Sequence, residues 1–254
     1  MEKKKLKALD PEEIEDQVVC YFDLEFCNDL ISRHNYPVSI GLSYRRGLEE
    51  LDHYSTVIRT PRYVNLWEEQ LNNIGQSKSY LYTHGARITN VAEHMLWLDE
   101  KYHPAYYLSF GAQDGDMLKK YTHERLLGLK FYDALAFLPK MLDLSYDISL
   151  ENYARICRLD FEHVYDPLED ARALGQVVVL IGRGEYDSGE RDRIVADYER
   201  KIFVSRYLDR QNACQYLEAL PRRSERQEEN LRRHRAFLKE NQLRFLSLQD
   251  QVEE

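Results

Sequence analysis

The chain has 254 residues, of which 43% are hydrophobic and 31% charged, and its net charge is −9 at pH 7. This length suits one substantial core with a smaller appendage. The acidic balance excludes a broadly basic nucleic-acid surface, and no stretch approaches the roughly 18 apolar residues of a membrane span. The acidic excess lies before Asp187, which fits a carboxylate metal site as well as ordinary solubility.

The cysteines and the start of the chain bear on the compartment. No CxxC spacing joins Cys20, Cys27, Cys157 and Cys214, so the sequence indicates neither a zinc site nor a disulfide framework. No apolar run follows the lysines at the start, so we expect no signal peptide. We expect a soluble protein of the reducing cytoplasm that does not associate with membranes.

The first half of the chain is rich in strand patterns. Apolar and polar residues alternate over residues 17–26, which predicts a strand. Strands at 36–46 and 53–59, joined by the polar segment 47–52, indicate an antiparallel meander. Further helices and strands then alternate. The predicted helices are 90–102, 114–126, 136–144, 149–159 and 167–184, and the predicted strands are 105–110 and 130–135.

This order predicts an α/β protein with a mixed sheet and helices packed on it. The composition changes near Tyr186, so we expect one domain at 1–186 and a helical C-terminal extension at 187–254. Acidic and basic residues interleave in the extension, which favours a solvated helix or coiled-coil face over a phosphate-binding stripe. Such a face has room for a second copy of the chain or for a protein partner.

Two carboxylates occupy the first predicted strand. Asp23 and Glu25 are two residues apart, so both side chains project from the same face. One interpretation is a solvated strand face. The other is a divalent cation site, because the strand is strongly apolar and buried carboxylates repel one another without a cation.

Two more acids follow in matching positions. Asp114 comes just after a predicted strand, and Asp170 lies one turn into a predicted helix. Four carboxylates from three separate segments are what a pair of Mg²⁺ ions, about 3.5–4 Å apart, needs for phosphoryl transfer.

Three motifs carry a resemblance to a known family. The stretches YFDLEFCND, YYLSFGAQDGDML and YDPLEDARAL resemble the three exonuclease motifs of the DEDD superfamily, the proofreading-type 3′–5′ exonucleases, and the stand-alone bacterial and ERI-type members in particular. The resemblance covers about residues 18–181. It implies an RNase H-like fold with a mixed five-stranded sheet flanked by helices.

The resemblance also implies an activity and a site. The activity is two-metal hydrolysis of single-stranded DNA or RNA from the 3′ end to nucleoside monophosphates, with Mg²⁺ or Mn²⁺ as cofactor. Asp116 is a rival to Asp114 as a ligand. The implied metal ligands are Asp23, Glu25, Asp114 and Asp170, and the candidate substrate contacts are Leu24, Phe26, His84 and Phe110.

The third motif departs from the family pattern. One branch has His five residues before the last Asp and the other has Tyr four residues before it, whereas here Tyr165 stands five before Asp170 and His163 seven before it. An ordinary phenol (pKa near 10) is a poor base at neutral pH, while imidazole (near 6.5) is a good one. Three interpretations stay open for Tyr165: it orients the attacking water, it blunts activity, or it is structural.

The neighbours of Tyr165 have simpler explanations. Asp166, followed by Pro167 and then by Glu169, makes a good helix start with an acidic N-cap. Glu169 also stands four residues after Tyr165, where the Tyr branch has its last Asp. It is therefore an alternative to Asp170 as a metal ligand.

Two other functions compete with an exonuclease. One is a nuclease-like scaffold that has lost turnover and binds nucleic acid or a protein partner. The other is a Mg²⁺ enzyme that acts on small nucleotides or dinucleotides. Retention of all four carboxylates favours an active exonuclease.

Overall fold

The computed structural model describes residues 11–162 and 165–249. Its contacts divide the chain into two compact units, residues 1–188 and 189–254. The first unit holds the five-stranded sheet and the second a pair of helices, and each is described by itself.

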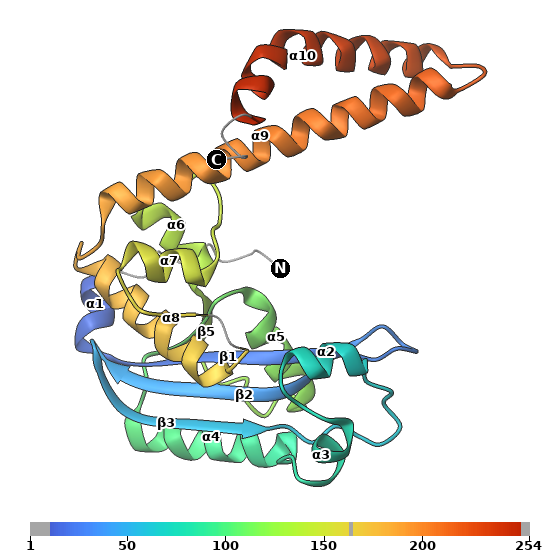
Figure 1. The fold of residues 1–254 in the computed structure, drawn as a ribbon. Coiled ribbons are helices and arrows are strands. Elements are labelled where there is room, and N and C mark those ends of the chain that lie inside the picture. Colours follow the sequence, from blue (N-terminus) through green and yellow to red (C-terminus); the bar gives the residue numbers. More distant parts are fainter. Residues whose placement is uncertain (1–10, 163–164, 250–254) are drawn as a thin grey trace. The chain divides into compact units, whose positions relative to one another are not determined.

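The sheet has the strand order β3-β2-β1-β4-β5. The first three strands form an antiparallel meander, and β4 and β5 add to β1 in parallel. The strands are β1 (Val18–Asn28), β2 (Asn35–Arg46), β3 (Glu49–Val57), β4 (Tyr106–Ser109) and β5 (Phe131–Asp133). The expected mixed five-stranded sheet with flanking helices is confirmed (Figure 1).

The two faces of the sheet are covered by different helices (Figure 1). Alternate β1 side chains, among them Phe22 and Leu24, pack with Met95 and Leu98 of α4 (Ile88–Tyr102) in one hydrophobic core cluster. On the opposite face, α8 (Pro167–Gly182) lies against β1 and β2. Asp23 and Glu25 alternate with the core residues, so they belong to the α8 face.

The remaining helices of this unit are mostly short. Three of them, α1, α2 and α3, were not predicted, because six residues hold too little periodicity to identify a helix. They are α1 (Pro11–Asp16), α2 (Glu68–Asn73), α3 (Lys78–Thr83), α5 (Ala112–Tyr121), a 3₁₀ turn η1 (Ala134–Ala136), α6 (Leu138–Met141) and α7 (Leu150–Ile156).

The helix predicted over 136–144 is shorter in the structure, where α6 covers only Leu138–Met141, and two other predicted boundaries are wrong. The polar segment 47–52 is mostly strand, because β3 begins at Glu49 and only Gly47, at φ 55°, and Leu48 form the turn. An edge strand tolerates such polar residues. The helix predicted to reach residue 126 ends at Tyr121, since His123 and Glu124 adopt left-handed backbone conformations.

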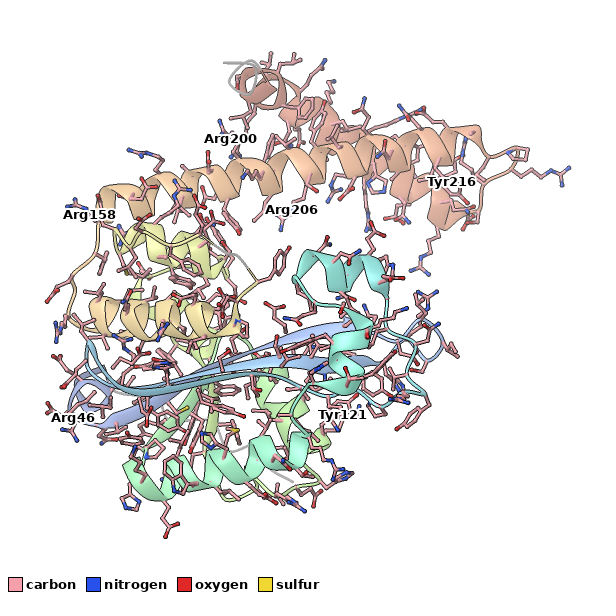
Figure 2. All side chains as sticks on the ribbon, turned by 60° about the horizontal axis from the view of Figure 1, so that its bottom comes forward. Arg46, Tyr121, Arg158, Arg200, Arg206 and Tyr216 are labelled. Atoms are coloured by element: carbon pink, nitrogen blue, oxygen red, sulfur yellow. The ribbon has the colours of Figure 1, made fainter. Side chains whose placement is uncertain are left out.

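The two ends of the sheet can be followed along β2. Its last residue, Arg46, lies at one end, and the Tyr121 hydroxyl donates to the carbonyl of Asn35, the first residue, at the other (2.7 Å; Figure 2). The turn after α5 therefore lies at the end of the sheet where β1 ends and β2 begins.

The second unit is an antiparallel pair, α9 (Ser188–Ala219) and α10 (Glu225–Gln249). Tyr207 stacks on Phe245 with 4.0 Å between ring centroids, and Arg235 pairs with Glu218 at 2.7 Å. Both contacts join residues far apart in sequence, as a chain reversal requires. None of the described helices of either unit combines the length and the apolarity that crossing a membrane needs.

Candidate active site

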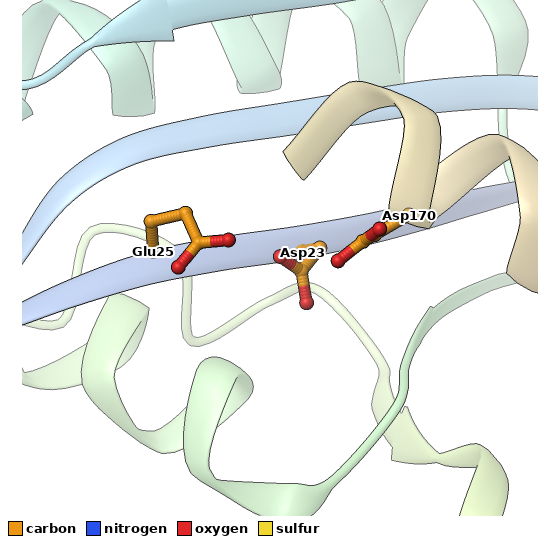
Figure 3. Close-up of side chains that lie close together, drawn as sticks. All are labelled: Asp23, Glu25 and Asp170. Carbon is orange, nitrogen blue, oxygen red and sulfur yellow. The ribbon is translucent and has the colours of Figure 1, made fainter. Parts of the chain in front are cut away.

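Three carboxylates meet on the α8 face of the sheet. One carboxylate oxygen each from Asp23, Glu25 and Asp170 lies within 4.8 Å of the others (Figure 3). The first two come from β1, and the third comes from the first turn of α8. The structure thus joins acids that are almost 150 residues apart in sequence.

Local packing explains how Asp170 reaches β1. The Asp166 side chain accepts a hydrogen bond from the Leu168 amide (2.9 Å) and starts α8. That start passes directly over Gly41 of β2, where a Cβ would lie 2.2 Å from the Leu168 nitrogen. Gly41 is the strand partner of Asp23. The absence of a side chain at Gly41 therefore allows α8 to place Asp170 beside Asp23.

Gly41→Ala is expected to push the start of α8 off the sheet. The obstacle is backbone rather than a flexible side chain, so we expect a loss of about 2 kcal/mol or more in the free energy of unfolding. This corresponds to a melting temperature several degrees lower. The control is Gly128→Ala, whose added methyl meets nothing within 4 Å. Equal melting temperatures in the two variants would contradict the close approach.

Asp114 completes the acidic group electrostatically. It lies in the first turn of α5 and is buried, whereas Asp116 two residues on is exposed. Burial is the main cause that raises the pKa of Asp23 well above its usual value, and the charges of Asp114 and Asp170 raise it further. Asp114 is not among the three acids whose oxygens lie within 4.8 Å of one another, but its charge raises the pKa of Asp23.

The Asp114 carboxyl is itself perturbed. Burial, with smaller contributions from the charges of Asp133 and Glu25, raises the pKa of Asp114 to about 7. No basic side chain is among the groups that shift the pKa of Asp23 or Asp114. Buried like charges without a basic partner are costly, and hard oxygen donors are the ligands that Mg²⁺ and Mn²⁺ prefer. The donor set fits a divalent cation.

The pKa of Asp114 predicts how the metal-free protein responds to pH. Its folded value near 7 exceeds the ordinary 3.8, so its contribution to stability is complete below about pH 4 and declines until about pH 7. In chelator, the melting temperature of the wild type should therefore fall from pH 5 to pH 7 relative to that of Asp114→Asn. The corresponding difference in the free energy of unfolding is on the order of a few kcal/mol. Asp116→Asn serves as the exposed control and should follow the wild type; parallel curves for all three proteins would contradict the assignment.

Tyr165 lies just before the helix that carries Asp170. Its side chain is 45% exposed, and its backbone is left-handed, with φ 54°. A tyrosine in this conformation costs about 1–3 kcal/mol, and such strain is commonly found at functional sites. His163 lies outside the described residues.

Glu169, the alternative ligand, has another partner. It is exposed and forms a salt bridge of 2.7 Å with Arg172, which also binds Glu50 of β3. Asp170, by contrast, is only 6% exposed and joins the acidic cluster.

The four candidate substrate contacts differ in accessibility. Leu24 is 4% exposed and Phe26 packs on the same core cluster, so the Leu24 side chain is not accessible to a ligand. Phe110 packs edge-on against Tyr153, with 5.9 Å between ring centroids. His84 is exposed, stacks on Tyr80 at 5.0 Å and lies 2.7 Å from the Thr83 hydroxyl.

One supporting residue had no assigned role in the sequence. Asp133, at the end of β5, accepts hydrogen bonds from the amides of Gly111 (3.0 Å) and Leu135 (2.9 Å). It thereby fixes the turn from β4 into α5 that presents Asp114.

Comparisons with known proteins show the fold. No protein-family model matches the chain, and no curated protein matches its sequence. Several solved structures are similar in fold. One is a structure of 3′-end-specific recognition of the histone mRNA stem-loop by a 3′-exonuclease. It has a TM-score of 0.55 at 12% identity, and the match covers 67% of this chain. This chain spans 65% of that one.

Two further structures agree. The nuclease domain of 3′hExo, a DEDDh family member bound to rAMP, has a TM-score of 0.50 at 14% identity, with 67% of this chain and 94% of that chain covered. Cell-death related nuclease 4 has a TM-score of 0.51 at 10% identity, with 68% and 67% covered. The first unit therefore has the RNase H-like fold of DEDD-superfamily 3′-exonucleases, as the three motifs implied.

Proposed function

We propose that the protein is a metal-dependent 3′–5′ exonuclease that hydrolyses single-stranded nucleic acid to nucleoside monophosphates. The observation that carries this proposal is the convergence of Asp23, Glu25 and Asp170, with the charge of Asp114 acting on Asp23. The fold similarity to 3′-exonucleases supports it. The four buried, free cysteines support the reducing cytoplasm as its compartment.

The proposed roles follow from where each side chain lies. Asp23, Glu25, Asp114 and Asp170 would hold two Mg²⁺ or Mn²⁺ ions. Bound there, these ions would supply a nucleophilic water and stabilise the leaving 3′-oxygen. Asp23 and Glu25 lie on a strand of the sheet, and Asp170 lies on a helix that packs closely on Gly41. Such rigid supports keep ligand positions constant during turnover.

Tyr165 is proposed to orient the attacking water. It precedes the N-cap of α8 by one residue and has a left-handed backbone, so it stands directly before the helix that carries Asp170. A phenol hydroxyl can donate to or accept from a water whose proton is already made labile by a nearby cation.

The α9–α10 hairpin is proposed as a separate appendage that serves assembly. Leu208, Leu243 and Leu246 are large apolar side chains exposed on it. A partner or a second copy of the chain would cover such residues.

The direct test is digestion of 5′-labelled single-stranded DNA and RNA with Mg²⁺, Mn²⁺ or chelator. We expect a ladder of products shortened from the 3′ end, formed with either metal and absent in chelator. Binding of both nucleic acids without cleavage under every condition would favour the scaffold without turnover. Cleavage of dinucleotides alone would favour an enzyme for small nucleotides.

A further inference from the structure

A cavity distinct from the carboxylate cluster opens where α5 ends and β2 begins. Its volume is about 380 Å³, within the range of small-molecule sites. The residues that the inference uses are Tyr36, Arg59, Thr60, Tyr63, Lys120 and Tyr121. They come from the start of β2, the segment after β3 and the end of α5.

Three tyrosines give the cavity a wall of aromatic rings. Tyr36 and Tyr121 lie 5.4 Å apart between ring centroids, and the bond from the Tyr121 hydroxyl to Asn35 holds that ring in place. Tyr63 is 82% exposed. Burial is the largest cause that raises the pKa of Tyr121 to about 12, and the nearby phenols of Tyr36 and Tyr63 add to the increase. An exposed ring beside two fixed rings is suited to stacking on a flat ligand.

The cavity is positively charged in an acidic protein. Arg59 and Lys120 line it, and none of the described residues that line it carries a carboxylate, although the net charge of the chain is −9. The Arg59 guanidinium is fixed by donating to the carbonyls of Gly85 and Thr83, each at 3.0 Å. Within the described part of the chain, neither cation forms a salt bridge with an acidic residue. Both charges remain available to an anion.

A buried hydroxyl adds a polar group to the wall. Thr60 is 2% exposed, and its Oγ1 has no hydrogen-bond partner among the described residues. A buried polar group without a partner costs about 1–3 kcal/mol. Rings, cations and an unsatisfied hydroxyl together match a ligand that has a flat ring, a negative group and polar edges.

The position of the cavity relates it to the carboxylates. Asp114 and Tyr121 lie near opposite ends of α5, seven residues or about 10 Å apart along the helix. Pro37, which lines the cavity, is the strand partner of Phe26, whose side chain packs in the α4-face cluster, so the cavity borders that face of the sheet. The helix α5 connects the two places, and a strand with its 3′ end at the carboxylates would reach the cavity by following α5 over this length.

We propose that this cavity binds one unpaired nucleotide of the substrate strand, upstream of the nucleotide that is removed. The base stacks against Tyr63 and its neighbouring rings, and a phosphate lies beside Arg59 and Lys120. The inference rests on the proposed function in one respect, namely that the 3′ end of the strand lies at Asp23, Glu25 and Asp170. This binding site would extend the recognised segment of the strand beyond the terminal nucleotide.

The test measures binding separately from cleavage. Fluorescence anisotropy in chelator gives the Kd of 5′-labelled single-stranded oligonucleotides of 2 to about 12 nucleotides. Tyr63→Ala should weaken binding of the longer oligonucleotides by about 5- to 100-fold, the scale of one lost stacked base, and leave the dinucleotide unchanged. The control is Tyr216→Ala, a similarly exposed tyrosine on α9. Lys120→Ala should also weaken binding and reduce its salt dependence, whereas Lys140→Ala, at an exposed lysine on α6, should not.

The outcomes separate this inference from the proposed function. With Mn²⁺, Tyr63→Ala should raise KM for a long oligonucleotide and leave kcat unchanged. The wild type could prove unable to hydrolyse nucleic acid while the variants still lose binding. This result would refute the proposed function and support nucleotide binding in the cavity. Unchanged Kd values in both Tyr63→Ala and Lys120→Ala would overturn the inference. It would also be overturned if Tyr63→Ala weakened binding of free 5′-AMP, measured by calorimetry, and left oligonucleotide binding intact.

Discussion

Asp23→Ala is expected to abolish metal-dependent hydrolysis and leave the fold intact. A carboxylate oxygen of Asp23 lies within 4.8 Å of one from Glu25 and one from Asp170, so the substitution removes a central proposed ligand. Without metal, the same variant is expected to melt at a higher temperature than the wild type at pH 8, because burial and the neighbouring charges disfavour its ionised form. Steady-state digestion with Mn²⁺ and thermal unfolding in chelator measure the two effects.

The matched control is Asp116→Ala, which removes an exposed carboxylate from α5. It should keep activity within a few-fold of the wild type and leave the melting temperature unchanged. Undiminished cleavage by Asp23→Ala would eliminate the two-metal mechanism. An inactive Asp116→Ala protein would show instead that the second motif is aligned two residues too early.

Tyr165→Phe is expected to lower kcat by about 10- to 1000-fold. The substitution keeps the ring and removes the hydroxyl, so the loss is that of one oriented hydrogen bond to the water. Tyr165→His should keep or raise activity and introduce a pH dependence near 6 to 7, because an imidazole there can accept the proton. Profiles of kcat against pH for the three proteins measure both effects.

Tyr216→Phe is the control for loss of an exposed phenol hydroxyl and should be fully active. His163→Ala should also have little effect. A fully active Tyr165→Phe enzyme together with an inactive His163→Ala enzyme would show that the third motif is aligned on the wrong residue. If every Tyr165 variant and the wild type bind nucleic acid and none cleaves it, the scaffold function is correct.

The sheet and the acids of β1 could be predicted from the sequence for a clear physical reason. Alternation along residues 18–26 separates Asp23 and Glu25 from the apolar face, and the structure confirms that the apolar face packs on α4. The N-cap at Asp166 was equally local, since an acidic side chain before Pro167 satisfies a free amide of the helix. Patterns of this kind depend only on neighbours in sequence.

Features that depend on packing between distant segments could not be predicted. Gly41 reads as an ordinary strand glycine until α8 is seen to cross it. Asp133 has no visible role until β5 lies beside the Gly111 turn. The cavity at Tyr36, Arg59 and Lys120 likewise joins three segments that no sequence period connects. Short helices such as α2 and α3 contain too few residues for a periodic signal.

The most direct test of the metal centre is calorimetric titration of the metal-free protein with Mn²⁺ at pH 8. We predict two Mn²⁺ ions per chain for the wild type, with at least one site lost in Asp23→Ala and neither lost in Asp116→Ala. Binding should weaken as the pH falls below about 7, because protons compete for Asp114. A wild-type protein that binds no Mn²⁺, or an Asp23→Ala protein that binds it equally well, would contradict the metal centre on which the proposed exonuclease depends.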